Sequence, residues 1–312
     1  MNLDKLTYFS YLSIKHNLLL PLKKFMSFND IKNCVMSMTY KKTFFPLPFF
    51  LSASEIDLNK INNNKLDLFY EKKKVGTIHI TSISIFKKAE IINFFSKKIK
   101  NFNSHPYFDY LKKSKEFIIE TSEFNKKIMN KKNKKYLGFA TRNIPHRGHE
   151  KIVKHFSKKN NILILVTEDT SKNKKINSDK TVFAYKIFLK KNNLTKKVDI
   201  IKIYSPSFLL GPRQAAIHAI IGKNLNCKKF IIGRDHSGYK DFYKTFDSYK
   251  FCKKNEKKMN IKIIESGSPV YCKNCKKIIF RKNCKCNNFI DISATLIRKI
   301  KNKKLKKILT NF

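Results

Sequence analysis

The sequence contains no tryptophan, and it has only eight glycines and eight prolines among 312 residues. It also lacks a long apolar run. The longest, residues 44–51, holds two prolines and falls well short of the roughly 20 residues that cross a membrane. No secretory signal is evident, because the apolar stretch 18–22 is short and contains a proline. We therefore expect a cytoplasmic protein with no membrane partner.

Acidic residues are few: 22 stand against 68 Lys and Arg, which gives a formal net charge of +46. Such a charge attracts nucleic acid and other polyanions. However, Lys, Asn, Ile and Phe are abundant together, as AT-rich coding favours, and the lysines are scattered rather than gathered in one stripe. We favour this compositional explanation and keep RNA binding as an alternative.

Arginine is scarce within the basic set, with only six of the 68 residues. Where composition favours lysine, an arginine that persists indicates chemistry that needs a planar fork, such as two parallel hydrogen bonds to an oxyanion. Four of the six lie between residues 142 and 234, close to five of the eight glycines. The arginines are Arg142, Arg147, Arg213, Arg234, Arg281 and Arg298.

The length and the hydrophobic fraction of 42 % suit about two domains. Residues 1–128 are predicted to form a first domain of short strands and turns with few long helices, and the Asn- and Lys-rich stretch 125–135 is the predicted linker. From 136 onward, four apolar strands (136–141, 161–167, 198–204 and 228–233) alternate with three helices (148–158, 181–191 and 213–223). This alternation predicts an α/β domain over 129–265 with a mainly parallel sheet.

A polar turn follows the first of these strands. Residues 138–150 end a strand near Thr141 and begin a helix near Gly148, where free backbone amides favour phosphate. His146 and His149 are three apart and therefore share one face if the helix begins there. Two imidazoles beside such a turn can donate hydrogen bonds to phosphate oxygens as charge develops. Taken alone, the pair is also compatible with surface histidines or an incomplete metal site.

Three further segments follow in order. Residues 211–214 (Gly-Pro-Arg-Gln) suit a helix start, and residues 233–238 (Gly-Arg-Asp-His-Ser-Gly) form a turn after a buried strand, where backbone amides can hold an anion. Residues 292–298 suit a capped helix that closes over a ligand. The alternatives without a ligand are, respectively, an ordinary helix start, a surface turn and a capped helix.

These four segments, in this order, resemble those of the sulfate adenylyltransferase (ATP sulfurylase) family. That family shows Gln-x-Arg-Asn running into His-x-x-His, then Gly-Pro-Arg-Glu, Gly-Arg-Asp-His-Ala-Gly and Ile-Ser-Gly-Thr-x-x-Arg. The resemblance extends to residues 45–48 and to His105 with Pro106 in the first domain. It implies a PUA-like β domain followed by a Rossmann-like nucleotidyltransferase domain.

The implied reaction transfers AMP from MgATP to sulfate, giving adenosine 5′-phosphosulfate and pyrophosphate, or runs in reverse. Because the acceptor oxygen attacks the α-phosphorus in line, catalysis rests on positioning and charge stabilisation. The implied partners are ATP, sulfate and pyrophosphate, with a homo-oligomer left open. By position, the resemblance assigns catalysis to Thr141, Arg142, Asn143, His146 and His149; ATP binding to Ala140, Thr141, Arg142, Asn143, Gly233, Arg234, Asp235 and His236; and sulfate binding to Arg142 and Ser237.

The sequence also departs from the family pattern. Ala140 stands where the family has the Gln that contacts sulfate, and Gln214 replaces Glu. A lost donor costs an anion site about 1–3 kcal/mol. A same-fold nucleotidyltransferase with another oxyanion acceptor, or a degenerate copy, is therefore the alternative.

Seven cysteines fall into two groups. Three isolated ones, at 34, 227 and 252, are expected to be small core residues. The other four follow the spacing Cys-x2-Cys-x8-Cys-x-Cys, which predicts a structural zinc site in a C-terminal segment, residues 266–312. A disulfide is the less favoured alternative in a reducing compartment. The four ligands are Cys272, Cys275, Cys284 and Cys286.

Overall fold

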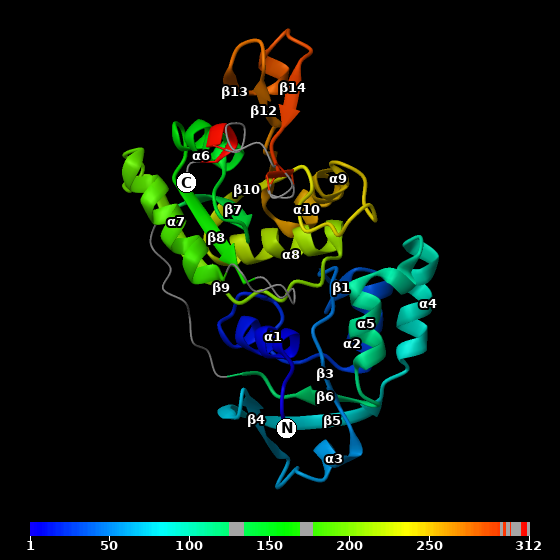
Figure 1. Cartoon of the computed structure of the whole chain (residues 1–312). Helices are drawn as coiled ribbons and strands as arrows, with labels where there is room; N and C mark the ends of the chain where they lie inside the picture. The colour runs from blue at the N-terminus through cyan, green and yellow to red at the C-terminus, as the bar shows by residue number, and fades with distance from the viewer. Residues whose placement is uncertain (125–133, 169–176, 294–295, 298–299, 301–306, 311–312) are drawn as a thin grey trace.

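The computed structural model describes the chain except for residues 125–133, 169–176, 294–295, 298–299, 301–306 and 311–312. Three parts follow one another along the chain and are stacked in space: an N-terminal unit, a central α/β unit and a small C-terminal ribbon (Figure 1). The predicted linker lies mostly outside the described residues. None of the described helices is long and apolar enough to cross a membrane.

The N-terminal unit is built on a four-stranded antiparallel sheet with the order β3-β6-β5-β4. Strands β4 and β5 form a hairpin that turns through residues 71 and 72, which both have positive φ, as a type I′ two-residue turn requires. The strands are β1 (Thr39–Tyr40), β2 (Thr43–Phe44), β3 (Leu51–Ala53), β4 (Lys65–Tyr70), β5 (Lys73–Ile85) and β6 (Phe117–Thr121). The residues between β2 and β3 are buried but form no strand, because two prolines there cannot donate to a ladder.

The described part of this unit also contains five helices of 4 to 11 residues, which were not predicted from the sequence. Helix α1 shows why: Asp4 caps its start, but Ser10 and Ser13 lie on its buried face, so the apolar spacing is interrupted. The hydroxyl of Ser10 donates to the carbonyl of Leu6, and that of Ser13 donates to Tyr204 of the central unit. The helices are α1 (Lys5–Lys15), α2 (Phe28–Met36), α3 (Glu55–Leu58), α4 (Lys88–Lys98) and α5 (Pro106–Lys113).

The central unit has a five-stranded, entirely parallel sheet with the order β11-β10-β7-β8-β9, which confirms the predicted fold class. The predicted elements are all present, with ends that differ from the prediction by at most three residues. The strands are β7 (Tyr136–Thr141), β8 (Ile162–Thr167), β9 (Val198–Ile203), β10 (Cys227–Ile232) and β11 (Lys262–Glu265). The helices are α6 (Arg147–Ser157), α7 (Ser178–Lys191), α8 (Gly211–Asn224), α9 (Asp247–Lys254) and α10 (Glu256–Met259).

Alternate residues of the strands feed two apolar cores. Leu137 and Phe139 of β7 pack with α6 and α7 on one face, whereas Ala140 belongs to the core that contains α8 on the other. That second core continues into the N-terminal unit, where it includes helix α2 and the segment around Phe49. The two units therefore share one hydrophobic core, and α8 lies at its centre. The three isolated cysteines are buried, as predicted.

Phe230 occupies a slot between the sheet and α8. A Cβ added at Gly138 of β7 or at Gly222 of α8 would stand 2.5 Å from this ring. Both distances are too short for a real contact, so the ring fits only because neither position has a side chain. These two glycines are thus explained by packing.

Arg213 ties the two units together. Its guanidinium donates to the carbonyls of Cys34 (3.2 Å) and Val35 (2.8 Å), in the last turn of α2, and to that of Pro46 (2.8 Å). The last carbonyls of a helix lack intrahelical partners and carry partial negative charge. Burial lowers the pKa of Arg213 to about 10, and the rings of Phe94 and Phe95 face its charge. This arginine serves the domain contact rather than an oxyanion.

His105 forms a second tie between the units. Its Nδ1 accepts the N–H of Tyr107 and so caps α5, which leaves Nε2 to donate to the carbonyl of Leu209 (3.3 Å) just before α8. Burial lowers the pKa of His105 to about 4, so the ring is neutral in this contact.

The C-terminal ribbon is a three-stranded antiparallel sheet with the order β13-β12-β14. Its strands are β12 (Pro269–Cys272), β13 (Lys277–Phe280) and β14 (Phe289–Asp291), and it projects at the top of Figure 1. Phe280 is 5 % exposed and packs against His155 of α6, so it joins the core of the central unit. The ribbon is thereby anchored on α6.

Replacing Arg213 by Lys should lower the free energy of unfolding by about 2–4 kcal/mol, because a single ammonium cannot meet three carbonyls from one buried position. Urea denaturation of the full chain measures this. The exposed Arg147→Lys serves as the matched control and should change stability by less than about 0.5 kcal/mol. Equal effects of the two substitutions would contradict the assigned role of Arg213.

Candidate functional site

The predicted turns lie at the point where the strand order reverses. After β7 the chain adds β8 and β9 on one side of the sheet, and then returns to place β10 and β11 on the other. Ligands of parallel α/β sheets bind beyond the carboxyl ends of the strands at such a switch point. The turn after β7 and the turn after β10 are neighbours there, since β7 and β10 pair. The topology therefore brings the first and third predicted segments together.

Arg142 is at the centre of a polar cluster built from three loops and α8. Its guanidinium donates to Ser207 Oγ, after β9, at 3.4 Å. It lies close enough to His218 of α8 and His236 of the β10 turn to lower the pKa of both, although burial is the larger cause in each case. His218 Nδ1 lies 2.9 Å from His236 Nε2 and 3.5 Å from Ser237 Oγ. The cluster thus brings together Arg142 and Ser237, the predicted anion-binding residues.

The cluster carries cationic and donor groups but no carboxylate among the described contacts. Burial holds the pKa of His236 at about 4 and that of His218 well below its ordinary value, so both rings are neutral near pH 7. Arg142 is then the source of positive charge, with hydroxyl and N–H groups around it. This donor set suits an oxyanion.

His146 and His149 form a stacked pair at the start of α6. Their ring centroids are 3.8 Å apart, with an interplanar angle of 19°. His146 is the N-cap: its Nδ1 accepts the backbone N–H of His149 at 3.4 Å, so its proton is on Nε2. Burial lowers the pKa of His146 to about 4 and that of His149 well below 6.5. The pair therefore places two neutral imidazoles at a helix N-terminus, and their role toward phosphate is still a prediction.

The other predicted residues have mixed placements. Thr141 Oγ1 accepts the N–H of Asn143 at 3.2 Å, which shapes the turn after β7. Ala140 is 8 % exposed and points into the core shared with α8. A Cβ at Gly233 would meet nothing within 4 Å, so the backbone faces open space there. Contact of these residues with a nucleotide is still a prediction.

Arg234 is paired with two carboxylates. It lies 3.2 Å from Asp235 and 3.2 Å from Asp291 of β14, which connects the β10 turn to the ribbon. The described part of the fourth segment begins a capped helix, because Ser293 accepts the N–H of Leu296. Arg298 lies outside the described residues. Ile292 approaches Gly148 at the start of α6, so this segment adjoins the histidine pair.

The four predicted cysteine ligands come together at the tip of the ribbon. Their Sγ atoms all lie within 4.8 Å of one another, and three pairs are 3.7–3.8 Å apart. Four thiolates at 2.3 Å around a tetrahedral zinc stand about 3.8 Å apart. The N–H of Cys275 donates to Cys272 Sγ and is the main cause that lowers the pKa of this thiol to about 7. The donor set therefore fits a metal ion with four sulfur ligands.

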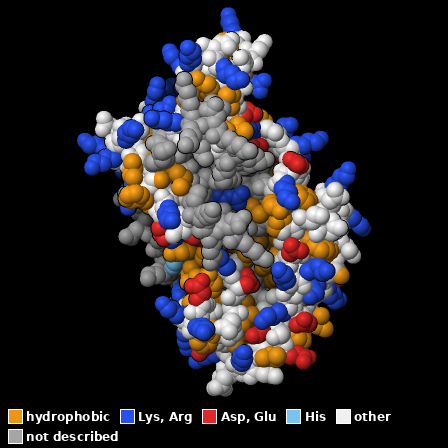
Figure 2. Space-filling view, in the orientation of Figure 1, with side chains coloured by type: hydrophobic (Ala, Val, Ile, Leu, Met, Phe, Trp, Pro, Cys, Tyr) orange, Lys and Arg blue, Asp and Glu red, His pale blue; other side chains and the backbone are white. Residues whose placement is uncertain are grey.

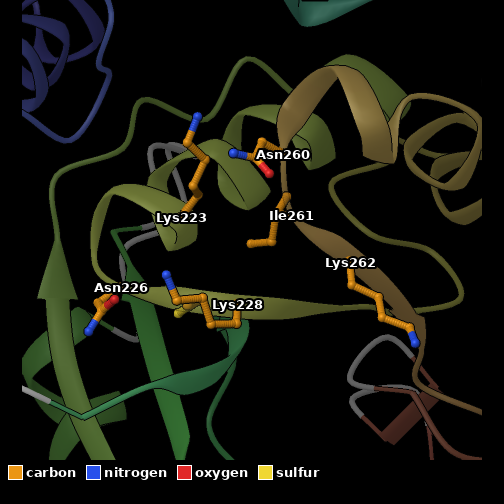
Figure 3. A pocket seen from close by; sticks show the side chains of 7 residues that line it. Lys223, Asn226, Lys228, Asn260, Ile261 and Lys262 are labelled. Carbon is orange, nitrogen blue, oxygen red and sulfur yellow. The ribbon is translucent and has the colours of Figure 1, made fainter.

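A hollow of about 420 Å³ lies elsewhere, at the amino ends of β10 and β11. Lysines, asparagines and an isoleucine border it, and the lysine side chains diverge (Figure 3). It is on the sheet edge opposite to the cluster and shares no residue with it. The lining residues are Lys223, Asn226, Cys227, Lys228, Asn260, Ile261 and Lys262.

Lysines and arginines are spread over the face seen in Figure 2, from the ribbon to the β4–β5 hairpin. Hydrophobic and acidic side chains are interspersed with them on this face. The scatter agrees with the compositional explanation of the net charge.

Three polar residues of the cluster were missed by sequence reasoning. Ser207 lies in a loop without a motif. Gln214 and His218 both lie on the buried face of α8, four residues apart. Gln214 stood in the predicted segment 211–214 without an assigned role. The signal of His218 was its polarity within an otherwise apolar helix face, which becomes informative once α8 is known to be buried.

The fold and the cluster define a class of protein: a parallel α/β unit with an oxyanion-suited switch point, preceded by a PUA-like unit. A family model described as ATP-sulfurylase matches residues 115–307, and one described as PUA-like domain matches residues 1–120. The chain belongs to the ATP-sulfurylase family.

Curated relatives agree with this. The sulfate adenylyltransferase of Halothermothrix orenii is 28 % identical over 221 residues, which cover 70 % of this chain and 56 % of that protein. The one of Trichodesmium erythraeum is 28 % identical over 279 residues, 81 % and 71 % of the two chains. The one of Persephonella marina is 27 % identical and matched over 48 % of its length, so this chain spans about half of some relatives.

A solved structure supports the fold. The hexameric APS kinase from Thiobacillus denitrificans aligns with a TM-score of 0.66 at 12 % identity, covering 96 % of this chain and 57 % of that one.

The buried histidines make stability depend on pH. The pKa of folded His146 is about 4 and that of an unfolded histidine about 6.5, so its contribution is complete above pH 6.5 and is lost as the pH falls toward 4. We expect the free energy of unfolding to fall over this window, by about 1–3 kcal/mol for this group. Urea denaturation at pH 7.5, 6 and 5 measures it.

His146→Asn retains an N-cap acceptor and should flatten this pH dependence. His79→Asn, at an exposed position, should leave it unchanged. Identical slopes in all three proteins would refute the assignment.

Proposed function

We propose that this protein is a sulfate adenylyltransferase, which transfers AMP from MgATP to sulfate and releases pyrophosphate, or catalyses the reverse reaction. The observation that carries the proposal is the convergence of Arg142, His218, His236 and Ser237 at the switch point of the sheet. Family membership and the relatives' names support the same reaction.

In this proposal the side chains act by position and charge. Arg142, with the backbone amide of Ser237, holds sulfate so that one oxygen points at the α-phosphorus. His146 and His149 donate neutral hydrogen bonds to the phosphate oxygens, next to the free amides of α6, where negative charge develops. Thr141 and Asn143 shape the catalytic turn, and residues 233–236 line the nucleotide. Since nothing is bonded covalently to the protein, these groups supply orientation and electrostatic stabilisation.

Magnesium would be bound to the nucleotide rather than to a site of its own. The two carboxylates nearest the β10 turn, Asp235 and Asp291, are both paired with Arg234. They are therefore poor candidates for a dedicated metal cage, and phosphate oxygens and water would supply the ligands.

One observation favours a second candidate acceptor. The side chain of Ala140 offers no hydrogen bond to sulfate and points into the core beside α8. A tetrahedral oxyanion other than sulfate, or a sugar phosphate, is the alternative acceptor. Pyrophosphate release with a panel of oxyanions separates the two: a strong preference for another anion would replace sulfate in the proposal.

We propose further that the cysteine cluster holds a structural zinc ion. All four positions are filled by cysteine, so no coordination site is open for substrate water. When bound, the ion would fix the ribbon that Phe280 anchors on α6 and that Asp291 links to Arg234.

Replacing Arg142 by Ala should lower sulfate-dependent pyrophosphate release at least about 100-fold, because the cluster loses its charged fork. The Lys variant should recover only part of it. The full chain with MgATP and sulfate is the assay system, and Arg281→Lys on the ribbon is the control. Unchanged turnover in Arg142→Ala, or no turnover in pure folded protein, would refute the proposal.

Purified protein should contain about one zinc per chain by elemental analysis, and Cys284→Ser should lower this content and the melting temperature. Cys34→Ser, which changes a buried cysteine outside the ribbon, should leave the zinc content unchanged. Metal-free protein of undiminished melting temperature would contradict a structural zinc.

A further inference from the structure

A chain of hydrogen bonds links the start of α8 to the β10 turn. The backbone N–H of Phe208 donates to Gln214 Oε1 at 3.1 Å. Gln214 Nε2 lies 3.3 Å from His218 Nε2, and His218 Nδ1 lies 2.9 Å from His236 Nε2. Gln214 is fully buried and His218 is 7 % exposed, so water does not compete for these bonds.

The chemistry of each group fixes the direction of the chain. A backbone N–H only donates, so the atom of Gln214 that it meets is the carbonyl oxygen, and the amide nitrogen faces His218. An amide nitrogen also only donates, so His218 Nε2 is the acceptor and carries no proton. The proton of neutral His218 is then on Nδ1, which donates to His236 Nε2. The proton of neutral His236 is consequently on Nδ1.

We propose that Gln214 and His218 are positioning residues that hold His236 in the tautomer with its proton on Nδ1, so that it offers a neutral N–H donor to a substrate oxygen beside Arg142. This inference rests on the proposed function. No described residue is hydrogen-bonded to His236 Nδ1, which leaves that donor for a ligand.

The surroundings keep the pair neutral. Arg142 faces both rings, each ring faces the other, and no carboxylate among the described residues contributes to either. Burial and these neighbours all oppose protonation. A glutamine at position 214 matches this environment, because a carboxylate there can only accept and would draw a proton to His218 Nε2.

The first test reads the tautomers directly and needs no activity. Histidine in the full chain is labelled with ¹⁵N, and two-bond ¹H–¹⁵N correlations report which ring nitrogen carries the proton. Loss of signals in His218→Asn and His236→Asn assigns the two rings. We expect both to be neutral, with Nδ1 protonated, from pH 6 to 8. Protonated Nε2 on His218, or a charged ring at pH 7, would overturn the proposal.

The second test uses Gln214→Glu. The carboxylate should move a proton to His218 Nε2 in the spectrum and shift the pH profile of kcat/KM. Lys223→Gln, on the same helix, makes the same change in net charge and should alter neither the tautomers nor the profile. Gln214→Met, of similar size, removes both hydrogen bonds of this side chain, and it should lose the tautomer preference and lower kcat/KM at least about tenfold at pH 7.

The outcomes separate the two proposals. If the wild-type chain has the expected tautomers but catalyses no adenylyl transfer, the proposed function fails and this role in it falls too. If transfer is observed and Gln214→Glu changes the spectrum without changing the pH profile or kcat/KM, the positioning role alone is refuted. Melting temperatures of all variants show whether they are folded.

Discussion

The architecture depends on how one buried positive charge is accommodated. Arg213 has no carboxylate in its described contacts, and its charge is met by the dipoles that end α2 and by the Pro46 carbonyl. Because Arg213 stands in the first turn of α8 and His218 stands five residues later, the element that fastens the N-terminal unit also carries a wall of the polar cluster. The relative placement of the two units and the shape of the site therefore depend on each other through α8. An α/β unit that folded alone would lack the contacts of Arg213 with the N-terminal unit.

Local sequence patterns were sufficient to predict the strands and helices of the central unit and the cysteine cluster of the ribbon. Strands β7 and β8 are buried on both faces and so stand out as continuous apolar runs. The four clustered cysteines lie within 15 residues of chain. Helix α1 was missed because buried serines interrupt its apolar face. Sequence alone also could not tell an arginine that binds backbone carbonyls from one that binds an oxyanion, since both uses exploit the same planar fork. Only the tertiary structure separates Arg213 from Arg142.

The residues of the polar cluster were predicted where they belong to a motif of consecutive residues, and were missed where they do not. Arg142, His236 and Ser237 belong to recognisable turns, whereas Gln214 and His218 reach the cluster through the burial of α8. Their polarity is compatible with burial because each donor meets an acceptor in sequence from Phe208 to His236. A buried network of this kind tolerates little change, because one altered group leaves the next without its partner.

The slot around Phe230 limits how this sequence can vary. Gly138 and Gly222 lie 84 positions apart along the chain, yet the same ring forbids a side chain at both. Neither glycine can be exchanged by itself, whereas a smaller residue at 230 would remove the shortest contact at both positions. Substitution at these three sites is thus collective, because a side chain at either glycine requires a smaller residue at position 230.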